Sequence, residues 1–117
     1  MNVTDLSVDL QKEFKQRQYF AQMDVLEQTS SLLKARLYIS PELFVQIYRN
    51  DRFHTTNLAL IYNGNRQFAR DELDGKWHRH MQAAPDEHDI SNEGSRAISL
   101  TEFLDEVEVV LAELNLP

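Results

Sequence analysis

The chain opens with a hydrophobic repeat typical of a helix and continues with repeats typical of strands. Leu6, Leu10 and Phe14 recur at every fourth position and form one apolar stripe. This stripe predicts a helix over residues 5–15, with the hydroxyl of Thr4 capping its first turn. After this helix the period changes to two, which predicts β-structure for most of the remaining chain.

Six segments alternate apolar and polar residues and predict strands that each bury one face. The first is ambiguous, because Phe20 and Leu26 interrupt its polar positions, and a helix is the alternative there. Ser40-Pro41 ends the second segment, since proline has no amide hydrogen to donate to a ladder. The six segments cover residues 18–27, 32–39, 43–48, 55–62, 66–71 and 76–81.

Two pairs of turn residues connect the last three of these strands. Asn63-Gly64 and Asp74-Gly75 can both adopt the positive φ angles of a two-residue type I′ hairpin. Such hairpins join neighbouring antiparallel strands. The stretch 82–96 contains Pro85, Gly94 and many polar residues, so we expect a loop there.

The C-terminal segment predicts a second helix. Ser99 and Glu102 have the spacing of a capping box, and Ile98 can pack on Phe103. We therefore expect a single α+β domain over residues 1–117, an antiparallel meander sheet of five to six strands with the N-terminal and C-terminal helices packed on one face. The apolar stripe that would cover the sheet consists of Leu100, Phe103, Leu104, Val107, Leu111 and Leu114.

The composition is that of an ordinary globular domain. The chain has 117 residues, of which 42% are hydrophobic and 26% are charged. It contains no cysteine, which excludes disulfides, thiolate metal sites and cysteine nucleophiles. It has no apolar run near the roughly 20 residues that cross a bilayer, and its first residues do not have the pattern of a signal peptide. We expect a cytoplasmic protein with no membrane partner.

The charge is negative and unevenly distributed. The net charge of −7 argues against broad binding of nucleic acid, which requires a basic surface, so any RNA contact is expected to be local. The C-terminal helix is acidic, whereas eight lysines and arginines lie between residues 34 and 79. Among these, Arg70 is expected to form a local ion pair with the adjacent Asp71.

Three of the four histidines lie within eleven residues. On a strand, His78 and His80 project from the same face, and Trp77 projects from the other as a core anchor. Imidazole titrates near neutral pH and is the commonest metal ligand, so chemistry is expected here. On other predicted strands, Tyr38 and Tyr48 could stack on bases or form a subunit interface, and the negative charge favours a homodimer interface.

Three interpretations of the histidines are open. His78, His80 and His88 could bind one metal ion, with acids around His88 adding oxygen ligands. Two imidazoles could instead act as acid and base without a metal or other cofactor, while Arg66 or Arg70 stabilises the charge on a phosphate. In the third interpretation, the histidines only form hydrogen bonds on an exposed sheet face.

Several segments resemble, in order and spacing, a small family of uncharacterised prokaryotic proteins found in archaea and cyanobacteria. The histidine-rich segment is also similar, more distantly, to TumE-type toxins of toxin–antitoxin pairs. Arg66 and Asp71 match the arginine and aspartate of the family pattern, whereas Ala69 and Met81 stand where a glycine and a proline are usual. The resemblance covers roughly residues 30–112 and is carried by residues 33–39, 43–48, 60–66, 70–71, 77–80, 88–89 and 99–104.

The resemblance implies a toxin-like protein with an antitoxin-like protein as its partner. Its site would contain His78, His80 and His88, with Arg66 and Asp71 as electrostatic support, and RNA cleavage or another phosphoryl chemistry would be its activity. The alternative is a non-enzymatic interaction module, a homodimer whose histidines are structural. A metal-binding protein without catalysis is a third possibility.

Overall fold

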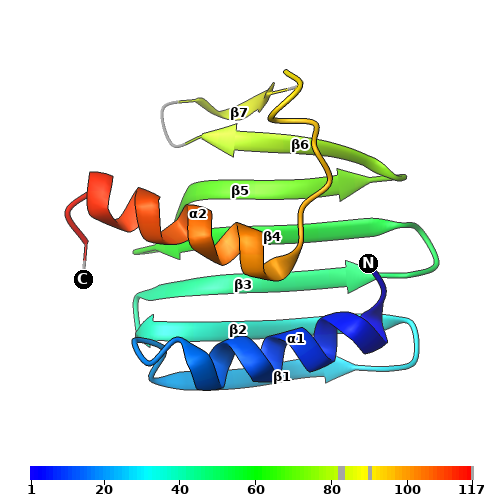
Figure 1. Cartoon of the computed structure of the whole chain (residues 1–117), viewed down its shortest axis with the longest axis horizontal. Helices are drawn as coiled ribbons and strands as arrows, with labels where there is room; N and C mark the ends of the chain where they lie inside the picture. The colour runs from blue at the N-terminus through cyan, green and yellow to red at the C-terminus, as the bar shows by residue number, and fades with distance from the viewer. Residues whose placement is uncertain (82–83, 90, 117) are drawn as a thin grey trace.

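The computed structural model describes residues 1–81, 84–89 and 91–116, and only the backbone of residues 84–89. These residues form one layer of sheet and one layer of helices (Figure 1). Each strand pairs only with its neighbours in the sequence, and every pairing is antiparallel. The elements are α1 (Val3–Gln16), β1 (Gln22–Gln28), β2 (Leu32–Ser40), β3 (Leu43–Asn50), β4 (Thr55–Tyr62), β5 (Asn65–Leu73), β6 (Lys76–Met81), β7 (Ala84–Asp89) and α2 (Leu100–Glu113).

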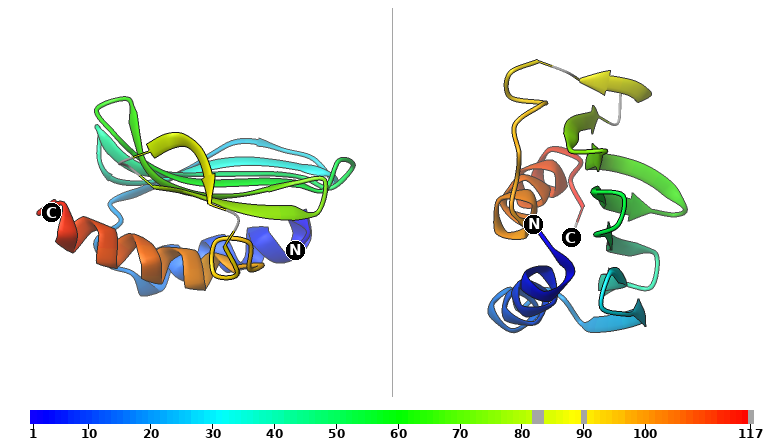
Figure 2. Two further views of the ribbon diagram at one scale, coloured as in Figure 1. Left: turned by 90° about the horizontal axis from the view of Figure 1, so that it is seen from above. Right: turned by 90° about the vertical axis from the view of Figure 1, so that its right-hand side faces the viewer.

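The expected α+β meander is confirmed, with both helices on one face of the sheet (Figure 2). The described part has seven strands, where five to six were predicted, and β7 lies in the stretch 82–96 that was expected to be a loop. Pairing explains the difference. β7 lies at the end of the strand order beside β6, and a strand at the edge of a sheet tolerates a proline such as Pro85. Neither helix of the described residues is long and apolar enough to cross a membrane.

The beginning of the chain differs from its prediction in one detail. The first helix is capped by Asn2, not Thr4, and the Asn2 side chain accepts a hydrogen bond of 2.8 Å from the Asp5 amide. An asparagine cap is as favourable as a threonine cap, and it lets the helix begin two residues earlier. The ambiguous segment 18–27 contains strand β1 and no helix.

Both predicted hairpin turns are present. Asn63 and Gly64 have φ angles of 50° and 78°, and Asp74 and Gly75 have φ angles of 53° and 80°. These values lie in the left-handed region that type I′ turns require. The predicted capping box is also confirmed, because the Ser99 and Glu102 side chains each accept a hydrogen bond from the other's backbone amide.

The hydrophobic core lies between the sheet and the two helices. Leu6 and Leu10 of α1 and Phe103 and Leu104 of α2 are buried against it. The Phe103 ring stacks on Phe68 of β5 with their centres 5.7 Å apart. Trp77 is in this core, as predicted. The strand residues that complete the core include Leu33, Leu37, Leu43, Ile47, Leu58 and Leu60.

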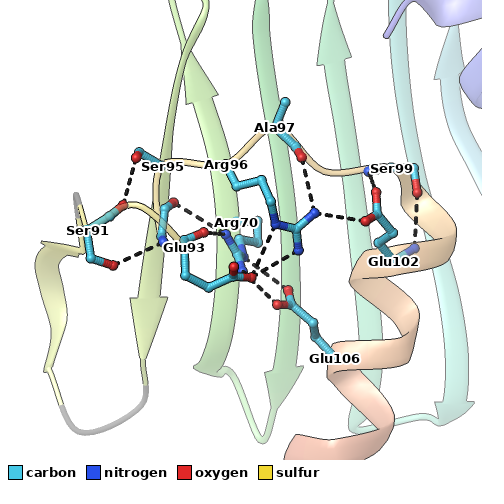
Figure 3. Close-up of polar contacts among 10 residues, drawn as sticks. Arg70, Ser91, Glu93, Ser95, Arg96, Ala97, Ser99, Glu102 and Glu106 are labelled. Atoms are coloured by element: carbon cyan, nitrogen blue, oxygen red, sulfur yellow. Dashed lines mark hydrogen bonds and ion pairs between the residues drawn. The ribbon is translucent and has the colours of Figure 1, made fainter.

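A fully buried arginine fastens α2 to the sheet (Figure 3). Arg70 of β5 donates two hydrogen bonds to the Glu106 carboxylate, at 3.0 and 2.6 Å, and one of 2.7 Å to the Glu93 carbonyl oxygen. The expected local pair of Arg70 with Asp71 is wrong, because neighbouring residues of a strand project from opposite faces. Arg70 therefore joins α2 and the segment before it to β5.

A second polar contact joins the two helices. Glu13 of α1 is 2% exposed and accepts hydrogen bonds from Thr101 and Arg17, and Arg17 also donates to Asp105 of α2 at 2.9 Å. Burial raises the pKa of the Glu13 carboxyl, but the hydrogen bonds from Thr101 and Arg17 outweigh it. The pKa of Glu13 consequently lies below its ordinary value, so the contact stabilises the charged carboxylate.

The substitution Arg70→Ala should lower the free energy of unfolding by about 3–5 kcal/mol, because it leaves the Glu106 carboxylate uncompensated. Urea unfolding followed by circular dichroism measures this change. The control is Arg52→Ala, at an exposed position after β3, which should change stability by less than about 0.5 kcal/mol. A loss below about 1 kcal/mol for Arg70→Ala would mean that α2 docks without this ion pair.

Acid should weaken the contact between the helices. A carboxyl whose pKa is lowered on folding stabilises the protein above its unfolded pKa, about 4.3 for glutamate, and this stability is lost as pH falls through the folded pKa. The difference in unfolding free energy between wild type and Glu13→Gln should therefore be largest near pH 7 and shrink toward pH 3. Glu113→Gln, at an exposed position, is the control. A difference that is the same at both pH values would contradict the charge-based explanation.

Candidate functional site

One face of the sheet carries no helix in the described part of the chain, and we call it the open face (Figure 2). Residues directly opposite each other on neighbouring strands project from the same face, so the register aligns side chains in rows. Arg36 of β2 and His80 of β6 lie near the two ends of one row. The adjacent row, which we call the Tyr48 row, consists of Lys34, Tyr48, Asn57, Asp71 and His78.

Three of the five predicted site residues meet on this face. Nε2 of His80 lies 3.2 Å from Oδ2 of Asp71, and His78 is directly opposite Asp71 in the ladder. Asp71 is 9% exposed and His80 is 4% exposed, whereas His78 is half-buried. The second carboxylate oxygen of Asp71, Oδ1, is buried and has no hydrogen-bond partner among the described residues. A buried carboxylate thus contacts the buried His80 imidazole and is the cross-strand neighbour of the more accessible His78.

The other predicted site residues are not brought to this point. Arg66 pairs with Ile61 near the start of β5, five residues and roughly 16 Å along the strand from Asp71. The alternative cation, Arg70, projects into the core on the other face. His88 belongs to β7, and its side chain lies outside the described residues.

The metal interpretation has little support in the described residues. They contain no group of three or more histidine, aspartate or glutamate side chains placed to hold a metal ion. The expected third ligand was His88, whose side chain is not among them. The chemistry that Asp71, His78 and His80 can perform without a metal is proton transfer, because an imidazole can both accept and donate a proton.

A hollow of about 390 Å³ opens on the same face over β2, β3 and β4, and we call it the Arg36 hollow. The Arg36 guanidinium lies 4.7 Å from the centre of the Phe44 ring and donates a 3.2 Å hydrogen bond to the Tyr38 hydroxyl. Tyr38 and Tyr48 were singled out in the sequence, whereas Arg36 was counted only among the basic residues between residues 34 and 79, and Asn57 was not singled out. The alternation shows which residues of one strand share a face, but only the register between strands shows which residues of neighbouring strands lie side by side. The polar lining consists of Lys34, Arg36, Gln46, Tyr48 and Asn57.

The fold and the open face define a small α+β protein that exposes one side of an antiparallel meander. No family model, curated protein or solved structure matches the chain. The expected relationship to TumE-type toxins therefore stays a prediction, and the geometry of the open face carries the functional argument.

The burial of His80 leads to a test of its role. His80→Ala should lower the free energy of unfolding by about 1–3 kcal/mol, because it leaves the buried Asp71 carboxylate beside a cavity. Thermal unfolding compares this variant with His54→Asn, which changes an exposed histidine at a positive φ that asparagine tolerates. Equal melting temperatures for the two variants would show that His80 does not support the fold.

Proposed function

We propose that the protein is a toxin-like ribonuclease that works without a metal ion, with its site on the open face. The observation that carries the proposal is the Asp71 carboxylate, placed 3.2 Å from the His80 imidazole and opposite His78. A carboxylate that contacts imidazole is a common means of orienting a histidine for proton transfer. The half-buried His78 is the imidazole that a substrate can reach.

The reaction that suits this arrangement is transphosphorylation of RNA. The His78 imidazole takes the proton of a ribose 2′-hydroxyl, and the 2′-oxygen attacks the adjacent phosphorus. The bond to the 5′-oxygen breaks, and this oxygen takes a proton from water. The products are a 2′,3′-cyclic phosphate and a 5′-hydroxyl. DNA lacks the 2′-hydroxyl and is not a substrate.

His78 and His80 differ in burial, and this difference decides the role of each in the proposal. Both imidazoles were expected to exchange protons with the substrate, but His80 is almost inaccessible. We therefore assign His78 as the catalytic residue, and its open-face neighbours Asp71 and His80 as positioning residues. Arg66 has no role here, because it lies at the other end of β5.

The proposal includes the expected partner. An antitoxin-like protein in the cytoplasm would inhibit the ribonuclease by covering the open face. Such a partner would also bury the aromatic side chains of that face, of which Tyr38, Phe44 and Tyr48 are half-buried in this chain. The net charge of −7 restricts RNA contact to this face, since broad binding requires a basic surface.

Cleavage of a single-stranded RNA oligonucleotide in the presence of EDTA tests the proposal. The wild type should produce 2′,3′-cyclic phosphate ends, and His78→Ala should reduce the rate by about 10²-fold or more, as loss of a general base does. The His54→Asn variant is the matched control, and a DNA oligonucleotide of the same sequence should remain intact. Undiminished cleavage by His78→Ala, or no cleavage by the wild type, would contradict the proposal.

A second candidate is the non-enzymatic interaction module, a homodimer joined through the open face. The burial of Asp71 and His80 favours it, because buried ionisable groups are often structural. A stable dimer in sedimentation equilibrium that Tyr48→Ala dissociates, together with the absence of cleavage, would support this candidate over the ribonuclease.

A further inference from the structure

We infer that the Arg36 hollow binds one nucleotide of a single-stranded RNA whose chain continues along the Tyr48 row to His78. This inference rests on the proposed function for the identity of the ligand as RNA. The hollow has about 390 Å³, within the range of 300–1,000 Å³ that small-molecule sites occupy. Its polar side chains come from three neighbouring strands and are held in register by the sheet.

The charge of Arg36 is available to an anion. Other arginines, Arg17, Arg49, Arg70 and Arg96, each have a carboxylate oxygen within 4.0 Å. For Arg36 the described residues provide none, and its buried Nε has no hydrogen-bond partner among them. Asp24 is its cross-strand neighbour on β1, but the described residues show no ion pair between the two, and the Asp24 carboxylate accepts a 2.8 Å hydrogen bond from Gln22. A half-buried guanidinium without a carboxylate attracts a phosphate.

The guanidinium is also held in place before a ligand arrives. Its stacking on Phe44 and its hydrogen bond to Tyr38 fix the orientation of the planar guanidinium group, so less side-chain entropy is lost when a ligand binds. Lys34, on the same face of β2, adds a second positive charge at the rim, although it lies 3.6 Å from Glu27. Because Glu27 offsets the charge of Lys34, the guanidinium of Arg36 supplies the positive charge that an anion in the hollow would contact.

The remaining lining residues suit a nucleobase. Tyr48 presents a half-buried ring, and every base has a face that can stack on it. The side-chain amides of Gln46 and Asn57 each carry donors and an acceptor, which match the polar edges of an unpaired base. These edges are occupied in a duplex, so the hollow favours single-stranded RNA.

The register connects the hollow with the proposed catalytic residue. Tyr48, Asn57, Asp71 and His78 are successive members of the Tyr48 row. With strands about 4.8 Å apart, the Tyr48 ring lies three spacings, or roughly 14 Å, from His78. An RNA chain that runs across the strands can thus place one base in the hollow and a ribose at His78.

The acidic residues of α2 do not oppose this contact directly. Five acids lie on α2, which covers the other face of the sheet (Figure 2). The sheet separates them from the open face, and salt screens charges over about 8 Å at physiological ionic strength. The negative net charge therefore coexists with a local site for an anion. The five are Glu102, Asp105, Glu106, Glu108 and Glu113.

Fluorescence anisotropy with a labelled 2′-O-methyl RNA decamer, which resists cleavage, tests the inference on the full chain. Arg36→Gln should raise the Kd at least 10-fold, and Tyr48→Ala should raise it about 5-fold or more. Arg52→Gln makes the same change of net charge at an exposed position after β3 and should alter the Kd less than twofold. Equal Kd values for Arg36→Gln and Arg52→Gln, or no binding by the wild type, would overturn the inference.

A second measurement uses the wild type alone, in case a variant fails to fold. Photo-crosslinking with a 4-thiouridine RNA should attach the base to peptides from β2 and β3, and a crosslink confined to α1 or α2 would overturn the inference.

The ribonuclease proposal and the inference about the Arg36 hollow can fail separately. RNA binding that depends on Arg36 but is not followed by cleavage would reject the ribonuclease and support the RNA site in the Arg36 hollow. Cleavage with the same rate and the same KM in wild type and Arg36→Gln would support the ribonuclease and reject the RNA site in the hollow.

Discussion

The position of α2 depends on one fully buried guanidinium. A charged side chain that is buried away from water is tolerated only when its hydrogen bonds are satisfied. Arg70 therefore requires acceptors from outside its own strand. The Glu106 carboxylate and the Glu93 carbonyl oxygen provide them, from the helix and from the segment that leads to it. This requirement limits how far α2 can slide or rotate on the sheet, and with it the packing of Phe103 on Phe68.

A single irregularity in β5 determines which face Arg70 occupies. The pairing of β4 with β5 shifts by one residue between Leu60 and Ile61, so that Gln67 is an extra residue in the ladder. A shift of one residue moves every following side chain to the other face. Without it, Arg70 would project from the open face and Asp71 would enter the core. The anchor of α2 and the position of Asp71 on the open face therefore have the same structural origin.

The sequence was informative where local chemistry decides the structure. The Asp74-Gly75 turn permits a single hairpin register, which already places Asp71 opposite His78. Ser99 and Glu102 likewise marked the start of α2 correctly. The bulge at Gln67 leaves no comparable signal, so the burial of Arg70 could not be read from the alternation. β7 was missed for a related reason, since its pairing with β6 compensates for a polar sequence that contains proline.

The outer strand β1 affects how separate copies of the protein behave toward each other. An unpaired strand edge offers backbone donors and acceptors to any other strand, which is the usual route to fibrous aggregates. In β1 the ladder is interrupted between Val25 and Glu27, and the acidic Asp24 and Glu27 flank the irregularity. A kinked and negatively charged border of this kind repels an identical border. The protein can thus keep a whole sheet face exposed without its edge becoming a template for polymerisation.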